Sequence, residues 1–336
     1  MIADPAATRT HVTAPGDARP SAGRRRLVNP IAATALTVAI FALILRRVPF
    51  PALAASLHDA DYRLFLALMI PNTLFYFAWD TLVLTVVIRW FHGGVPYRDL
   101  LPVRAASYVV GFFNTNLGRG AMAAYLHRRL HAPFLELGST VIFLVLTEYT
   151  QLVIWAMLGV VGFRAEVTSS LLAVAAAVAI FWLLLRWLLA PRAWSLLRTF
   201  RLATAPRYAQ IVLLRAPMFF VSLCLHYYAA HAFGIDIPFS QMLTFLPVIF
   251  MLAALPVTVA HLGTTQAAWI FFFSEYAPAP RLLAFSLAAH LVFASTRALL
   301  GVLWLPAVYF DLLPAGDERR GFSIAEWTQR TPRTQR

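Results

Sequence analysis

The chain has 336 residues, of which 60% are hydrophobic and only 13% are charged, and its formal net charge is +13. Soluble domains carry about 25% charged residues, so this composition excludes a soluble enzyme or binding domain and indicates an integral membrane protein. A basic chain can bind nucleic acid, but here the arginines are scattered over loops and ends. That distribution favours anionic lipid headgroups as partners, and we expect no nucleic acid.

A helix needs about 20 apolar residues to cross the hydrocarbon core of a bilayer. Six runs qualify, and we expect a transmembrane helix at about 27–45, 64–90, 137–162, 168–190, 210–234 and 282–310. Residues 1–26 are expected to form a disordered, basic cytoplasmic tail. Residues 27–310 then form one transmembrane domain, and 311–336 form a second cytoplasmic tail. The segment Ala52–Ser56 resembles a signal-peptide cleavage site, but the long polar region before the first run favours a retained anchor.

Two further stretches, about 102–117 and 240–275, are apolar but contain residues that break a helix. Such breaks cannot face lipid, because each unpaired backbone group costs several kcal/mol there. We therefore expect two re-entrant segments, each entering and leaving the membrane on one side. They enter from opposite faces in two units, 64–162 and 210–310, as in transporters with inverted repeats. The alternative that one or both are kinked crossings stays open.

The first broken stretch leads into FFNTNLGRGAMAAYLHRRL, residues 112–130. Asn114, Asn116 and Gly118 are poor helix formers and predict the break. From Arg119 onward the pattern is amphipathic, which predicts a helix lying at the cytoplasmic face of the membrane.

The second broken stretch contains LPVTVAHLGTTQAAW, residues 255–269. Pro256 removes a backbone donor, and Gly263 frees the chain to turn. A helix that only crossed lipid would not need such residues, so we expect this segment to line a cavity. Its polar candidates are His261, Thr264 and Gln266, with Gly263 at the turn.

The arginines predict the orientation, because basic residues of short loops favour the cytoplasmic side. With the N-terminus inside, most arginines, Arg104 among them, fall inside, while Arg215 and Arg297 lie within spans. If both broken stretches crossed the membrane, the arginine-rich loop 186–209 would lie outside, against this rule. We expect a multi-pass protein of the bacterial cytoplasmic (inner) membrane with both termini in the cytoplasm. The arginines left outside are Arg46, Arg47, Arg63, Arg164 and Arg281.

Ionisable groups inside a bilayer are costly and mark functional sites. The clearest here are Asp80, Glu148 and Arg297. Glu148 and Arg297 lie near the middle of their spans, and pairing them would offset their desolvation. Gln151 shares a helix face with Glu148, and His290 shares one with Arg297. We expect a polar pathway for a lipid headgroup, while the alternative of an ion pair that only fixes helix packing stays open.

The candidate residues for substrate binding are the intramembrane polar groups and those of the broken segments. They are Asp80, Asn114, Asn116, Arg119, Glu148, Gln151, His261, Gly263, Thr264, Gln266, His290 and Arg297. The sequence shows no metal-binding HExxH, no P-loop and no GxGxxG motif, and its single cysteine excludes a cysteine-based metal site. We therefore expect no metal, no cofactor and no catalytic residue.

Several positions match the motifs of a known membrane family. Pro256 to Thr258 and Gly263 fit one motif, although Ala260 and His261 replace its glycine pair and Gln266 replaces its acidic residue. NLGRGAMAAYLHRRL stands where the family has its other glycine-rich motif. Glu148 and Arg297 match a glutamate and an arginine of the family, while Tyr149 stands for an arginine and Gln151 or Leu152 for an aspartate.

These positions resemble the transmembrane domain of lysylphosphatidylglycerol synthases, which is shared with stand-alone flippase-like membrane proteins. The resemblance covers about residues 30–310. It implies that the chain moves an amphiphilic lipid, an anionic phospholipid or a lipid-linked glycan, between leaflets. From the residues we expect Arg297 to bind the phosphate of the headgroup and rocking of the two halves to alternate access. The related synthases also carry a large soluble catalytic domain. Only a short tail follows Phe310 here, so we expect that chemistry to be absent.

Two other functions stay open. One is an intramembrane transferase acting on a lipid-linked substrate, with Glu148 or Asp80 as its base. The other is a non-transporting partner of a lipid-modifying enzyme, which the missing acid at Gln266 would explain. A homo-oligomer also stays open.

Overall fold

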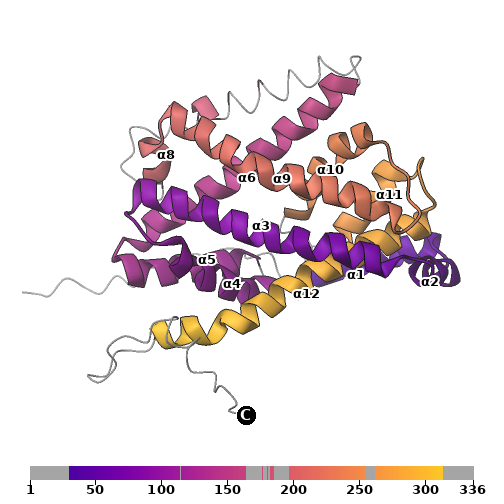
Figure 1. The fold of residues 1–336 in the computed structure, drawn as a ribbon, viewed down its shortest axis with the longest axis horizontal. Helices are drawn as coiled ribbons and strands as arrows, with labels where there is room; N and C mark the ends of the chain where they lie inside the picture. The colour runs from indigo at the N-terminus through magenta and orange to yellow at the C-terminus, as the bar shows by residue number, and fades with distance from the viewer. Residues whose placement is uncertain are drawn as a thin grey trace, which may run out of the picture.

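Helices make up about 87% of the structure, a computed structural model, and the fold is that of an all-α polytopic membrane protein (Figure 1). The structure describes residues 30–113, 115–163, 176, 180, 182–184, 197–254 and 262–312, and no strand occurs among them. In chain order the helices are α1 (Pro30–Arg47), α2 (Phe50–His58), α3 (Tyr62–Phe91), α4 (Tyr97–Phe113), α5 (Thr115–Leu130), α6 (Phe134–Phe163), α8 (Arg198–Leu202), α9 (Ala205–His231), α10 (Phe239–Ala254), α11 (Thr264–Phe273) and α12 (Ala279–Leu312).

Four helices, α3, α6, α9 and α12, are long and apolar enough to cross a membrane. They confirm four of the predicted spans. The first predicted span is α1, which bends by 91° into α2, so that the two together would make a fifth. The predicted span at 168–190 lies almost wholly outside the described residues, as do both predicted tails. On α12, Leu291, Leu299 and Leu303 are 68%, 61% and 66% exposed, which fits a face turned to lipid.

Both broken stretches form helical hairpins rather than kinked crossings. α4 and α5 lie so close that a Cβ added at Gly118 would be 2.7 Å from the Gly111 Cα. In the second hairpin, Phe245 of α10 stacks on Phe272 of α11 with 4.8 Å between ring centroids. Each pair therefore turns back on itself, as a re-entrant segment requires.

The amphipathic stretch after Arg119 differs from its prediction. It was expected to lie flat on the membrane surface, but it is the return arm of the first hairpin, α5. Met122, Tyr125 and Leu126 are buried, whereas Arg128 near the end of the helix is exposed. Amphipathicity only shows that one face is covered, and here protein covers it instead of lipid headgroups.

The two units of the fold run in opposite directions. α3 and α9 pack side by side, and the backbone N of Asp61, before α3, donates to the Ala232 carbonyl, after α9, over 2.8 Å. At the other end the Arg207 guanidinium of α9 lies 5.4 Å from the Phe91 ring centroid of α3. The two central helices are therefore antiparallel. The hairpins α4–α5 and α10–α11 lie at opposite ends of this pair (Figure 1).

Each unit holds the hairpin of the other. α12 packs on α4, and α6 packs on α10. Both contacts are close because a glycine of the long helix faces the hairpin. A Cβ at Gly159 of α6 would be 2.7 Å from the Thr244 Cα, and one at Gly301 of α12 would be 2.8 Å from the Ala105 carbonyl oxygen. Small residues allow such approach between membrane helices, where no hydrophobic force drives association.

Two apolar cores lie at the two ends of the bundle, and a polar layer separates them. One core contains Phe65 and Phe285, and the other contains Phe91 and Phe143. The long helices pass through both cores and place their polar residues between them. These residues are Asn72 and Asp80 of α3, Glu148 and Gln151 of α6, and Arg215 of α9.

Candidate functional site

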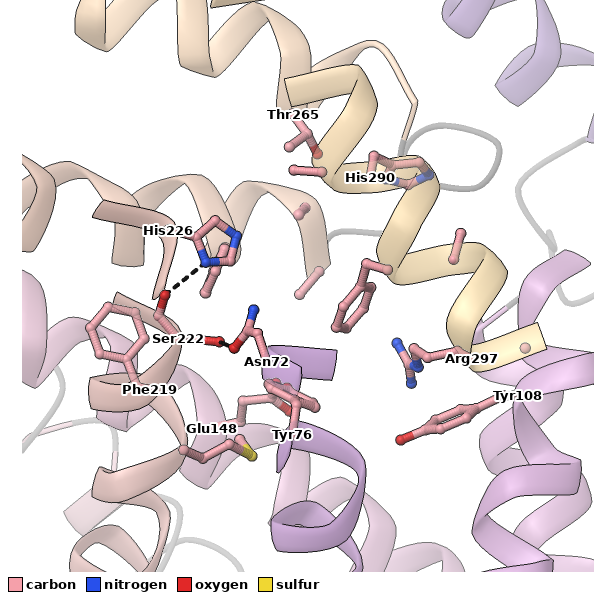
Figure 2. A pocket seen from close by; sticks show the side chains of 18 of the residues that line it. Asn72, Tyr76, Tyr108, Glu148, Phe219, Ser222, His226, Thr265, His290 and Arg297 are labelled. Atoms are coloured by element: carbon pink, nitrogen blue, oxygen red, sulfur yellow. Dashed lines mark hydrogen bonds between the residues drawn. The ribbon is translucent and has the colours of Figure 1, made fainter. Parts of the chain in front are cut away.

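A cavity of about 310 Å³ occupies this polar layer. It is lined by residues of α3, α4, α5, α6, α9, α10, α11 and α12, which include all four long spans and both hairpins (Figure 2). The cavity therefore lies between the two units of the fold. Its size falls at the lower end of the 300–1,000 Å³ that is typical of small-ligand sites.

An ion network forms one wall of the cavity. Asp80 pairs with Arg104 of α4, and its other oxygen is 3.9 Å from Arg215 of α9. Arg215 is also 3.8 Å from Glu148 of α6, whose Oε1 accepts a hydrogen bond from the Tyr76 hydroxyl over 3.1 Å. Arg215 keeps only 3% of its surface, whereas Glu148 keeps 28%. Charges this deep persist when they are paired, so the network joins four helices into one unit.

This network also separates two cavities. A second, smaller cavity of about 40 Å³ is lined by Asp80, Leu84 and Leu144 among others, and it shares Arg104, Arg119, Glu148 and Arg215 with the first. On α3, residues between 69 and 76 line the large cavity, and residues between 80 and 84 line the small one. The charged groups thus stand between two spaces that follow one another along the bundle.

Arg297 takes a different position from the one expected. Its guanidinium lies 3.6 Å from the ring centroid of Tyr108 and 4.8 Å from that of Phe293. In the described part of the chain it forms no ion pair, so the expected Arg297–Glu148 pair is wrong. Figure 2 shows the polar ends of Arg297 and Tyr108 turned to the side where Tyr76 lies. Stacking on aromatic faces is a common way to hold an arginine while its donors stay available.

A neutral hydrogen-bonded chain forms another part of the wall. The Ser222 hydroxyl of α9 donates to the Asn72 side-chain oxygen of α3 over 2.8 Å (Figure 2). His226, one turn on, places its Nδ1 2.7 Å from the Ser222 carbonyl. These side chains are buried, and their hydrogen bonds remove the cost of burying polar atoms.

Gln151 lines the cavity but also bonds the backbone of α9. In the amide orientation that satisfies its neighbours, its nitrogen donates to the Val212 carbonyl over 3.0 Å, and its oxygen accepts from the Ala216 N–H over 2.9 Å. Nearby, Trp79 donates to the Leu214 carbonyl over 2.6 Å, and Pro217 lacks an N–H. Pro217 therefore weakens the hydrogen-bond ladder of the continuous helix α9 next to Arg215, and side chains of α3 and α6 bind backbone groups there.

Replacing Gln151 by methionine should destabilise the protein, since the Val212 carbonyl and the Ala216 N–H would lose their partner in an apolar interior. Each unsatisfied backbone group costs about 1–3 kcal/mol. We expect a lower unfolding temperature in detergent and faster amide hydrogen exchange over residues 212–217. Ser295→Ala, at an exposed position of α12, is the control. Unchanged exchange in that segment would contradict the structural role of Gln151.

The remaining predicted residues fall into three groups. Arg119 and His290 line the cavity, and Asp80 adjoins it through Arg104. Asn114 and His261 lie outside the described residues, and of Asn116 only its place in α5 is described. Gly263, Thr264 and Gln266 do not line the cavity, where Thr265 lies instead.

Gln266 caps a helix, whereas its place in the family motif predicted a residue of the substrate pathway. Its Oε1 accepts a hydrogen bond from the Gly263 N–H over 2.7 Å, which caps the start of α11. Gly263 has φ +93°, which glycine adopts without strain. Its Cα faces α1, because an added Cβ would be 3.1 Å from Ile40. Gly263 and Gln266 therefore stabilise the first turn of α11 and do not line the cavity.

Sequence reasoning missed several residues of the site, among them Arg104, Arg215 and Tyr108. Arg104 was counted only among the cytoplasmic arginines, Arg215 was noted in a span without a role, and Tyr108 was not singled out. Only Arg215 carried a signal, because a charge in an apolar run is costly. Within the described ranges no group of three or more His, Cys, Asp or Glu could hold a metal ion.

No protein-family model matches this chain, and no curated protein matches its sequence.

Proposed function

We propose that this protein moves an amphiphilic lipid with an anionic headgroup between the leaflets of a membrane. The observation that carries the proposal is the cavity between two oppositely directed units, which is lined by four arginines and one carboxylate, Glu148, among the described residues. A surplus of cationic groups around a cavity favours an anionic occupant. Transporters built from inverted repeats bind their substrates at such an interface.

In the proposed mechanism the headgroup enters the large cavity while the acyl chains stay in lipid. Arg297 binds the headgroup from the side opposite the ion network. The network of Asp80, Arg104, Arg215 and Glu148 then acts as the gate to the small cavity. An anion that reaches Arg215 competes with Glu148 for it, which loosens the gate. Rocking of the two units then alternates access.

The motif residues resemble those of flippase-like proteins of the lysylphosphatidylglycerol synthase family, and this resemblance also supports the proposed function. The arginine distribution supports a bacterial cytoplasmic membrane with both termini inside. Both assignments are part of the proposal.

The test is a scrambling assay in liposomes. Purified protein is reconstituted with fluorescent phospholipids, anionic or zwitterionic, and the accessible fraction is measured by dithionite bleaching. We expect faster bleaching than in protein-free liposomes. Arg297→Gln should slow it roughly 10- to 100-fold, because one charge-assisted hydrogen bond contributes about 1.5–3 kcal/mol.

The control is Arg63→Gln, since Arg63 is exposed at the start of α3 and should not affect transport. Bleaching at the protein-free rate for every lipid would reject transport of these lipids and favour the non-transporting partner. Equal rates for Arg297→Gln and the unchanged protein would remove Arg297 from the pathway.

A lipid-linked transferase is the second candidate, and one observation favours it. Glu148 faces the cavity with part of its surface open, and Tyr76 holds one of its oxygens in place. A carboxylate so placed could accept a proton from a substrate hydroxyl. Glu148→Gln separates the two functions, because it would abolish product formation by a transferase and only weaken a gate.

A further inference from the structure

The four arginines that line the cavity in the described part of the chain differ in whether a carboxylate balances their charge. Arg104 is balanced by Asp80, and Arg215 lies between Asp80 and Glu148. Two arginines and two carboxylates therefore neutralise each other. Arg119 and Arg297 have no carboxylate partner among the described residues, although both line the cavity. The site thus carries two uncompensated positive charges.

These two charges come from the two units of the fold. Arg119 lies on α5 of the first hairpin, and Arg297 lies on α12, the last span. An uncompensated charge that is partly withdrawn from water is costly, so an occupant of matching opposite charge would be favoured over any other. A phosphodiester headgroup carries one negative charge and would leave one arginine unbalanced. A phosphate monoester or a diphosphate carries about two and balances both.

We propose that the cavity selects a dianionic phosphate headgroup, a phosphate monoester or a diphosphate, clamped between Arg119 and Arg297. The inference rests on the proposed function only in taking the anion to be the headgroup of a lipid. Zwitterionic and singly charged headgroups of similar size bind more weakly.

The geometry around Arg297 fits a clamp. Tyr108 and Phe293 hold the guanidinium by stacking, so little rotamer freedom is lost when an anion binds. The Tyr108 hydroxyl is buried and has no hydrogen-bond partner among the described residues, as is also true of Arg297 Nε. Buried polar groups normally have hydrogen-bond partners, so the Tyr108 hydroxyl and Arg297 Nε are available to donate to a bound anion. The cavity of about 310 Å³ suits a compact phosphate group better than an oligosaccharide.

The test measures lipid binding rather than transport. Native mass spectrometry of the purified protein, or quenching of its tryptophan fluorescence, is recorded against phosphatidate, phosphatidylglycerol and phosphatidylcholine with identical acyl chains. At pH 9 phosphatidate should bind at least tenfold more tightly than phosphatidylglycerol. At pH 5, where its second proton returns, this preference should disappear, because phosphate monoesters lose that proton near pH 6.

Two single substitutions test whether Arg119 and Arg297 bind the phosphate. Arg119→Gln and Arg297→Gln should each lower phosphatidate affinity by roughly 10- to 100-fold, with a smaller change for phosphatidylglycerol. Arg128→Gln is the matched control, because Arg128 lies on the same helix as Arg119 but is exposed. Unfolding temperatures of all variants show whether each is folded. Equal binding of phosphatidate and phosphatidylglycerol, or a preference that survives in folded Arg119→Gln/Arg297→Gln, would overturn the proposal.

Two comparisons separate this inference from transport itself and from a soluble ligand. A preference for phosphatidate without scrambling would support the clamp and reject transport, whereas scrambling with no preference would overturn the clamp alone. Glycerol 3-phosphate is added as a competitor. Displacement of phosphatidate by it at similar concentration would support a soluble phosphate ester as occupant, and failure to displace would support a lipid.

Discussion

Arg215→Gln is expected to lower the free energy of unfolding by about 3–5 kcal/mol, the usual cost of removing one partner from a buried ion pair. Arg215 is 3% exposed and lies within 4 Å of both Asp80 and Glu148. Asp80 would keep Arg104, but Glu148 would keep only the hydrogen bond from Tyr76. Thermal or urea unfolding in detergent, followed by tryptophan fluorescence, measures the loss.

A second substitution tests whether the loss comes from the stranded carboxylate. Glu148→Gln in the Arg215→Gln background removes that charge, so the double variant should be more stable than the sum of the two single losses predicts. Arg63→Gln, on the exposed start of α3, is the control. If Arg215→Gln unfolds like the control, or if the two losses simply add, the network does not hold the four helices together.

Gly118→Ala should be strongly damaging for so small a substitution. A Cβ there would lie 2.7 Å from the Gly111 Cα and 2.7 Å from the Ser107 carbonyl oxygen, and backbone atoms cannot move aside as a flexible side chain can. We expect a loss of stability of about 1–3 kcal/mol. Because Arg119 follows directly, separation of α4 from α5 should also shift its guanidinium and weaken the proposed transport.

Two neighbouring glycines are matched controls on the same hairpin. A Cβ at Gly111 would meet only the Gly118 Cα, at 3.9 Å, and one at Gly120 would meet nothing within 4 Å. Gly111→Ala should therefore be tolerated, and Gly120→Ala should stabilise α5 by up to about 1 kcal/mol through helix propensity. Equal unfolding temperatures for all three variants would show that α4 and α5 do not pack at this distance.

Hydropathy predicted the transmembrane helices because every helix that crosses the lipid needs a long run of apolar residues. A run such as 210–234 must be largely apolar to cross, and it forms most of α9. The helix breakers after Phe113 and Ala254 predicted hairpins because irregular backbone cannot face lipid. The place of α5 in a hairpin was not predicted, since its pattern marks a covered face without saying what covers it.

The site could be predicted only in part. Asp80, Glu148 and Arg297 were found because a charge in an apolar run is conspicuous. Their partners were not, because pairing depends on which helices meet. Arg104 was counted only among the cytoplasmic arginines, because its pairing with Asp80 depends on how the first hairpin packs on α3. Gln266 was placed in the pathway from a motif, whereas its amide caps α11.

The exchange of hairpins between the two units has a consequence for how the chain folds. α4 finds its main support on α12, the last of the helices that the structure describes, and α6 finds its own on α10. The side of the first hairpin that faces α12 therefore stays uncovered until nearly the whole described chain has entered the membrane. Contacts this distant in sequence make folding slow. The uncovered hairpin is the surface that a membrane chaperone or a second nascent chain would meet during that interval.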